Sequence, residues 1–316
     1  MADIKTWKID KPFLALKGAL LEGPAYDETS DLLRWVDIIK RQVSFLKFSE
    51  GSLRSLHTLT LQNDDTIGVL WKIQGEKTRL FAGAKYGLAS FSTDTGELEY
   101  FYRYFGTKEM GFRFRSNDGA IDAHGRIFQG ILVDEQIDTP CADGKLICMD
   151  LDGSVRTVID NVTCPNGLGW NCTNTIMYWA ESASGNLYAF DYDLETGMPS
   201  NQRVFFHLEP GTGEEHNTNV PDGLAVDVED HIWLAVWGSA EVLRISPGGE
   251  VVGRIEVPTR FVTCPAFVGT ELVITTAEER DKERYPESAE QGGNLFRCEV
   301  GVRGLERFAC RAVWRK

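Results

Sequence analysis

The feature that most constrains the fold of this chain is a short apolar segment that recurs six times. Each copy is rich in Val, Ile, Leu, Phe or Trp. The copies begin at positions 33, 80, 127, 177, 232 and 272, which are 40 to 55 residues apart. A period of about 40–50 residues holding four short strands is typical of one blade of a β-propeller. Six such units predict an all-β fold, a six-bladed β-propeller that occupies residues 1–316 as one domain.

The stretches between the copies fit the same fold. After most copies, a second strand-like run leads into a glycine turn, as in Leu88–Ser92 and Leu187–Asp191. A single blade cannot bury both of its faces, but blades stacked around an axis bury one another. To close the ring, we expect a strand near Phe13–Leu16 to pair beside Phe308–Val313 in the last blade; the alternative is that both ends of the chain fray.

Charge and composition argue against nucleic acid and membranes as binding partners of this protein. The chain has 33 Lys and Arg against 47 Asp and Glu, a net charge of −14 that repels nucleic acid and anionic lipid. It has no apolar run long enough to span a membrane and no secretory signal in its first residues. Its seven cysteines lack Cys-x-x-Cys spacing, which indicates reduced thiols and a cytoplasmic location. The oligomeric state stays open.

Short polar segments precede four of the six copies, where the innermost strand of each blade would begin. They are Glu22–Ala25, Asn117–Ala120, Asn166–Gly169 and Asp222–Ala225. Any one of these Asx-Gly or Glu-Gly pairs could simply be a turn. At equivalent places in four blades, however, two carboxylates and two amide oxygens would meet at the channel axis. Such an oxygen-rich cage, with a charge of about −2, suits one divalent cation: Ca²⁺, Zn²⁺, Mn²⁺ or Mg²⁺.

Other site chemistries lack their motifs. The five histidines are scattered without His-x-x-x-His spacing, which disfavours an imidazole zinc site. The sequence has no Gly-x-Ser-x-Gly, P-loop or Gly-x-Gly-x-x-Gly motif. Serine hydrolase and nucleotide-binding functions are therefore unsupported.

Four groups of segments between about Leu21 and Phe296 follow an order found in one protein family. They are Leu21–Pro24 with Leu33–Ile38, Arg115–Gly119 with Gly125–Arg126, Asn166–Trp170 with Phe190–Asp193 and Thr196–Gly197, and Pro221–Leu224 with Trp233–Ala235 and Trp237–Gly238. The set resembles the senescence-marker-protein/gluconolactonase family, the regucalcin-like lactonases, whose fold is a six-bladed propeller.

This resemblance implies site residues. It places metal ligands on Glu22, Asn166 and Asp222, and substrate contacts on Arg115 and Asn117, with Asn117 as a further, indirect ligand. Glu135 lies near a position that can touch substrate in relatives; the alternative is a solvated loop acid.

The chain also departs from the family pattern. Glu181–Ser182 stands where Asp-Ser is usual, Phe128–Leu132 replaces a commoner Gly-Thr-Met run, and the loop Glu278–Gln291 is long and charged. These differences leave the predicted cage intact and bear on the identity of the substrate.

The resemblance implies metal-assisted hydrolysis of a sugar-acid lactone. The cation would polarise the ester carbonyl while an activated water attacks it. Asp222 is the predicted base, and water activated by the cation alone is the alternative. A phosphotriesterase or arylesterase using the same cage, and a non-catalytic calcium-binding propeller, are the competing functions.

Overall fold

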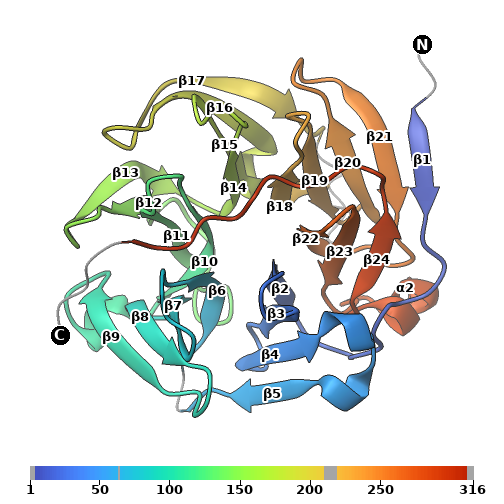
Figure 1. The fold of residues 1–316 in the computed structure, drawn as a ribbon, viewed down its shortest axis with the longest axis horizontal. Helices are drawn as coiled ribbons and strands as arrows, with labels where there is room; N and C mark the ends of the chain where they lie inside the picture. Colours follow the sequence, from blue (N-terminus) through green and yellow to red (C-terminus); the bar gives the residue numbers. More distant parts are fainter. Residues whose placement is uncertain (1–3, 63–64, 210–218, 312–316) are drawn as a thin grey trace.

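Six β-sheets are arranged as blades around a central axis in the computed structural model, which describes residues 4–62, 65–209 and 219–311 (Figure 1). Within each blade, consecutive strands pair antiparallel from the innermost strand outward. The predicted six-bladed β-propeller is therefore confirmed.

The strands follow one another blade by blade. Blades one to three contain β2 (Leu21–Asp27), β3 (Leu32–Asp37), β4 (Gln42–Lys47), β5 (His57–Thr60), β6 (Ile67–Lys72), β7 (Arg79–Ala84), β8 (Gly87–Ser92), β9 (Leu98–Arg103), β10 (Phe114–Ile121), β11 (Ile127–Val133), β12 (Gly144–Met149) and β13 (Val155–Val162). Blades four to six contain β14 (Pro165–Trp170), β15 (Ile176–Glu181), β16 (Asn186–Asp193), β17 (Met198–His207), β18 (Val220–Val226), β19 (Ile232–Trp237), β20 (Glu241–Ile245), β21 (Val251–Glu256), β22 (Val262–Val268), β23 (Glu271–Thr276) and β24 (Phe296–Glu299).

The six apolar repeats form the second strand of each blade: β3, β7, β11, β15, β19 and β23. Their largest side chains are almost fully buried, including Trp35, Phe81, Phe128, Trp179 and Trp233. Both faces of these strands are covered because neighbouring blades pack against them, which is why the repeats read as continuous apolar runs rather than alternating ones. Hydrophobic contact between blades, rather than within one sheet, builds the core.

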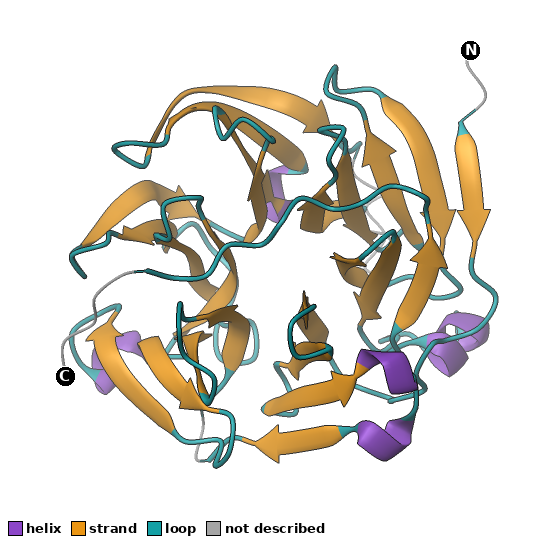
Figure 2. Cartoon of the chain, in the orientation of Figure 1, coloured by secondary structure: helices purple, strands orange, loops and turns teal. Residues whose placement is uncertain are grey.

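Helices are few and short, and they lie outside the sheets (Figure 2). They are α1 (Lys108–Gly111), α2 (Pro286–Gln291) and the 3₁₀ turns η1 (Phe48–Glu50), η2 (Leu53–Ser55) and η3 (Ser182–Ser184). No helix in residues 4–62, 65–209 or 219–311 is long and apolar enough to cross a membrane. All seven cysteines, which lie within these ranges, are free thiols, as predicted.

The predicted closing strand is wrong in its partner. Leu14 forms a single bridge with Leu295, just before β24, rather than with residues 308–311. The first strand, β1 (Lys5–Lys8), instead pairs parallel to β21 and extends the fifth blade. The ring closes between the first and last blades through side chains and short contacts, including a 2.6 Å hydrogen bond from the Thr263 hydroxyl to the Leu21 carbonyl.

The C-terminal segment, residues 301–311, crosses one face of the ring from the last blade to the second (Figure 1). Gly304 bridges to Asp227 on the way, and Cys310 pairs with Ile73. Cys310 is buried in the apolar cluster of blades two and three, so burial holds the segment there. This explains the wrong partner, because residues 308–311 are already bound elsewhere; 312 and 313 lie outside the described residues.

Candidate active site in the central channel

Four of the predicted site residues sit on innermost strands of different blades: Glu22 on β2, Asn117 on β10, Asn166 on β14 and Asp222 on β18. In each of these strands the pairing with the second strand shifts beside the site residue. The shifts fall at Glu22/Ala25, Ser116/Gly119, Pro165/Leu168 and Pro221/Leu224. A β-bulge re-aims side chains away from the regular alternation. The four side chains can therefore turn towards the same region of the channel.

Glycines at these bulges allow the innermost strands to come close. A Cβ atom on Gly167 would lie 2.7 Å from the Asp222 carbonyl oxygen, and one on Gly223 would lie 2.8 Å from the Cα of Cys264. Neither distance is possible for a real side chain, so only glycine fits. Gly167 and Gly223 thus lie at strand bulges beside the next blade, not in the reversing turn that such pairs often form.

Glu22 and Asp222 place two carboxylates in a buried, electrostatically unfavourable setting. Their residues are 9 % and 5 % exposed. Burial, followed by the charges of Asp222 and Asp118, raises the pKa of Glu22 well above its ordinary value. Burial, followed by the charge of Asp118, also raises the pKa of Asp222. No Lys, Arg or His of the described chain forms a salt bridge with either carboxylate.

Asp118 is a third acid in this group. Burial raises its pKa from 3.8 to about 6, although its carboxylate accepts a 2.7 Å hydrogen bond from the Gly119 amide. Its charge in turn raises the pKa of both Glu22 and Asp222. Burial of three acids this close to one another disfavours their ionised forms, and a bound cation would stabilise those forms.

The two amides are joined by hydrogen bonds across blades three, four and five. Asn117 Nδ2 donates to the Pro165 carbonyl at 2.8 Å and to Asn166 Oδ1 at 3.2 Å. Asn166 Nδ2 donates to Ser182 Oγ at 2.8 Å, and that hydroxyl donates to the Pro221 carbonyl at 2.6 Å. The chain of contacts ends next to Asp222.

Arg115 lies at the other end of this series of hydrogen bonds. Its Nη1 donates to Asn117 Oδ1 at 2.7 Å and to the Ser116 carbonyl at 3.1 Å. Its Nε and Nη2 donate to both carboxylate oxygens of Glu135, at 2.9 to 3.2 Å. Glu135, whose side chain is 27 % exposed, is thus held by Arg115 rather than free in a solvated loop. All three nitrogens of the Arg115 guanidinium thus donate to protein acceptors.

Behind Arg115 lies a buried ion pair. Lys85 Nζ is 2.9 Å from Asp134 Oδ2, and both side chains are 5 % exposed. Asp134 Oδ1 is 3.9 Å from Arg115 Nε. Desolvating such a pair is costly and seldom gives net stability, so its position behind Arg115 is the more informative feature.

A second acidic group lies at the opposite end of β18, in the turn to β19. Asp227, Glu229 and His231 bring ligand-type atoms within 4.8 Å of one another. Arg244 Nη2 already occupies this group, at 2.9 Å from Asp227, 2.7 Å from Glu229 and 3.2 Å from His231 Nδ1. The guanidinium supplies the positive charge that a metal ion would bring. We therefore interpret this group as a structural ion-pair network.

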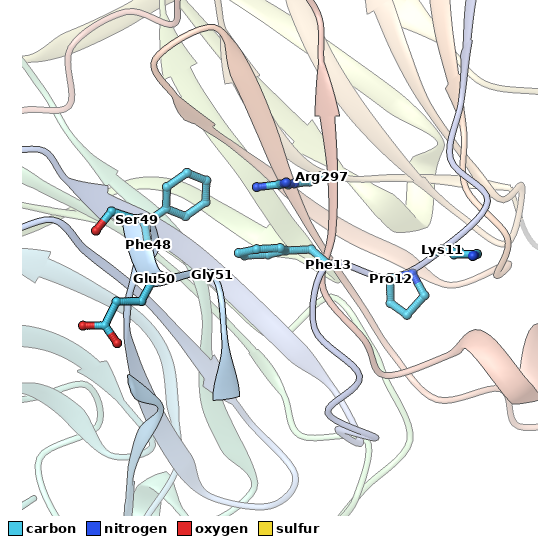
Figure 3. A pocket seen from close by; sticks show the side chains of 8 residues that line it. All are labelled: Lys11, Pro12, Phe13, Phe48, Ser49, Glu50, Gly51 and Arg297. Atoms are coloured by element: carbon cyan, nitrogen blue, oxygen red, sulfur yellow. The ribbon is translucent and has the colours of Figure 1, made fainter. Parts of the chain in front are cut away.

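A pocket of about 560 Å³ opens elsewhere, between the N-terminal segment and the turn after β4 (Figure 3). Phe13 and Phe48 line it with ring centroids 5.5 Å apart, and Arg297 lies 4.9 Å from the Phe13 ring. Glu50 is its one acidic lining residue. It brings no group of catalytic or metal-binding side chains together.

Comparison with known proteins identifies the family of this chain. Residues 20–278 match the family described as the SMP-30/Gluconolactonase/LRE-like region. The chain belongs to the SMP-30/gluconolactonase family. The resemblance seen in the sequence is thereby confirmed.

One relative and one solved structure match nearly the whole chain, and a second relative matches about three fifths of it. A putative sugar lactone lactonase, YvrE of Bacillus subtilis, is 28 % identical over 291 residues, which are 90 % of this chain and 92 % of that protein. Regucalcin of Sus scrofa is 33 % identical over 201 residues, covering 61 % of this chain and 65 % of regucalcin. A calcium-binding regucalcin structure from Agrobacterium tumefaciens has a TM-score of 0.81 at 25 % identity and covers 99 % of both chains. Members of this SMP-30/gluconolactonase family thus include proteins named for lactone hydrolysis and for calcium binding.

Sequence reasoning missed three residues of this family member's site. Asp118 could have been predicted from the sequence, because it follows Asn117 directly in the Asn-Asp-Gly segment. Ser182 appeared only as part of a departure from the family pattern. Lys85 gave no signal, because a lysine between two strands is ordinarily a solvated residue.

Proposed function

We propose that this protein is a metal-dependent lactonase that opens a sugar-acid lactone. The observation that supports this function is the proximity of the buried Glu22 and Asp222 carboxylates, which form no salt bridge within the described residues, beside the Asn166 amide. Membership of a lactonase-containing family supports the same reaction class.

The donor set fits a divalent cation. Two carboxylates and an amide oxygen are hard ligands of the kind preferred by Ca²⁺, Mg²⁺ and Mn²⁺, and Zn²⁺ also accepts them. Glu22, Asn166 and Asp222 would hold the ion, and the raised pKa values of the two acids reflect the charge that it would neutralise. When bound, the ion supplies polarisation of the ester carbonyl and stabilisation of the developing oxyanion.

Asp222 is the proposed general base. Burial raises its pKa towards the range in which a carboxylate accepts a proton readily. Asp222 would take a proton from the attacking water and return it to the ring oxygen that leaves, so that the ester C–O bond breaks and a hydroxy acid forms. The charge of Asp118 raises the pKa of Asp222 further and so strengthens it as a base.

Arg115, Asn117 and Glu135 are the proposed substrate-binding residues. The carboxylate of Glu135 can accept hydrogen bonds from lactone hydroxyls, and its double contact with Arg115 fixes its orientation. Because Asn117 already donates its two amide hydrogens to Pro165 and Asn166, it must exchange one of those contacts to donate to substrate. A site of this kind selects for hydroxyl-bearing substrates, because other molecules would leave its polar groups unpaired.

The experiment combines metal stripping with a substrate panel. Chelator-treated protein is assayed for acid release from aldonolactones of five- and six-membered rings, then with Ca²⁺, Mg²⁺, Mn²⁺ or Zn²⁺ added back. We expect activity only with an added cation, and loss of both activity and cation binding in Glu22→Gln. Glu28→Gln, an exposed acid in the turn after β2, is the matched control. Full activity in the stripped protein would contradict the mechanism.

The same assay separates the competing functions. Turnover of aryl esters or phosphotriesters without aldonolactone turnover would assign the cage to that chemistry. Tight Ca²⁺ binding without hydrolysis would make the protein a calcium-binding propeller, the property named for the Agrobacterium relative. We place the protein in the cytoplasm on the strength of its seven free thiols.

A further inference from the structure

The hydroxyl of Ser182 has a single proton, and its neighbours determine where that proton goes. Ser182 is buried, and its Oγ lies 2.6 Å from the Pro221 carbonyl oxygen, which can only accept. The proton is therefore donated to Pro221. The hydroxyl can then offer only lone pairs to the Asn166 amide, 2.8 Å away.

This contact decides which way the Asn166 amide faces. Its NH₂ group must point at Ser182, because its carbonyl oxygen would meet another lone pair there. These hydrogen bonds form a relay that runs from Arg115 through Asn117, Asn166 and Ser182 to Pro221, and the Arg115 end requires the same orientation of Asn166. Arg115 has only donors, so it fixes the oxygen of Asn117 towards itself, and the NH₂ of Asn117 then faces Asn166 Oδ1.

We propose that Ser182 is a positioning residue that holds the Asn166 amide with its oxygen turned towards the cation position. The inference rests on the proposed function, because it assigns Ser182 a role through a proposed ligand. Asn166 Oδ1 accepts one hydrogen bond from Asn117 and keeps a second lone pair for the ion. Without Ser182, the buried NH₂ group would keep only the Cys164 sulfur, 4.0 Å away, and the Asp222 carboxylate as acceptors, and it could rotate its nitrogen towards the ion.

The test measures Ca²⁺ affinity by titration calorimetry in a double-mutant cycle. We expect Ser182→Ala to weaken Ca²⁺ binding about tenfold, as for other residues that orient a ligand. Ser182→Thr keeps the hydroxyl and should restore affinity to within about threefold of wild type. Ser184→Ala, in the same 3₁₀ turn but outside the relay, is the matched control.

The cycle is completed in the Asn166→Asp background. A carboxylate presents oxygen in either orientation, so Ser182→Ala should there cost less than about threefold. Equal losses in both backgrounds would overturn the inference, because they would reduce Ser182 to a structural link between blades. Wild-type affinity in Ser182→Ala would overturn it as well.

The outcomes also separate this inference from the function on which it rests. If wild type binds Ca²⁺ and Glu22→Gln does not, the proposed cage is supported, and the double-mutant cycle then tests the role of Ser182. If wild type and Glu22→Gln bind Ca²⁺ equally, the proposed cage is wrong, and so is the proposed role of Ser182. Should Ser182→Ala fail to fold by circular dichroism, Ser182→Cys, of similar size and with a weaker donor and acceptor, replaces it in the cycle.

Discussion

Replacing Asp118 with Asn should make the cation-free protein more stable and the cation-binding protein weaker. Burial raises the pKa of Asp118 from 3.8 to about 6, which means that the folded protein holds its proton more tightly than the unfolded chain. Stability is therefore lost as the pH rises from about 4 through 6, because the acid must ionise inside the fold.

The size of the effect follows from the same pKa. A rise from 3.8 to about 6 corresponds to about 3 kcal/mol, an upper limit because Asp118 is only partly buried. With an unfolding entropy of about 2.1 cal/mol/K per residue, this would raise the melting temperature of a chain this long by about 4 °C. The gain should be present at pH 8 and vanish near pH 4, where the acid is protonated in both states.

The assay is thermal unfolding in chelator across this pH range, with Asp94→Asn, an exposed loop acid, as the control. The same variant should lose about tenfold in Ca²⁺ affinity, since one of three clustered charges is gone. A melting temperature for Asp118→Asn in chelator at pH 8 that equals or falls below wild type would refute the electrostatic account of the cage.

Three further results are expected. Saturating cation at about 100 times its dissociation constant should raise the free energy of unfolding of chelator-treated wild type by about 2.7 kcal/mol, whereas Asp222→Asn should show no shift in the same melting experiment. Lys85→Met should lower the free energy of unfolding, measured in urea, by about 3–5 kcal/mol, because it leaves Asp134 buried without Lys85. Adding Asp134→Leu to this variant should recover part of the loss. If Lys85→Met lost less stability than the same substitution of an exposed lysine, the burial argument would be contradicted. Arg244→Ala should leave the Ca²⁺ stoichiometry in calorimetry unchanged, and a second bound ion would show that Asp227 belongs to a metal site after all.

Much of the fold could be predicted because its determinants repeat along the chain. The apolar runs that contain Trp35, Phe81 and Trp233 identify the strands that are buried on both faces, and their count equals the number of blades. The closing contacts could not be predicted in this way. Residues 308–311 carry no periodic signal, and they bind across the ring face only because an apolar site near Ile73 is available there.

The candidate site divides in the same manner. Glu22, Asn166 and Asp222 stood out because a polar residue beside glycine recurs at one place in several repeats. Lys85 and Ser182 belong to no repeated pattern, and each gains its importance from a partner in another blade, at 2.9 Å from Asp134 and 2.6 Å from the Pro221 carbonyl.

The amino-acid sequence by itself determined the class of fold, the number of blades and the positions from which acids and amides would face the axis, because hydrophobic burial and repeat spacing are properties of the linear chain. Only the tertiary structure decided which hydrogen-bonding groups meet across blades, where the C-terminal segment binds and which acidic cluster already holds an arginine. Those outcomes depend on distances between residues far apart in sequence, and such distances exist only after the ring has closed.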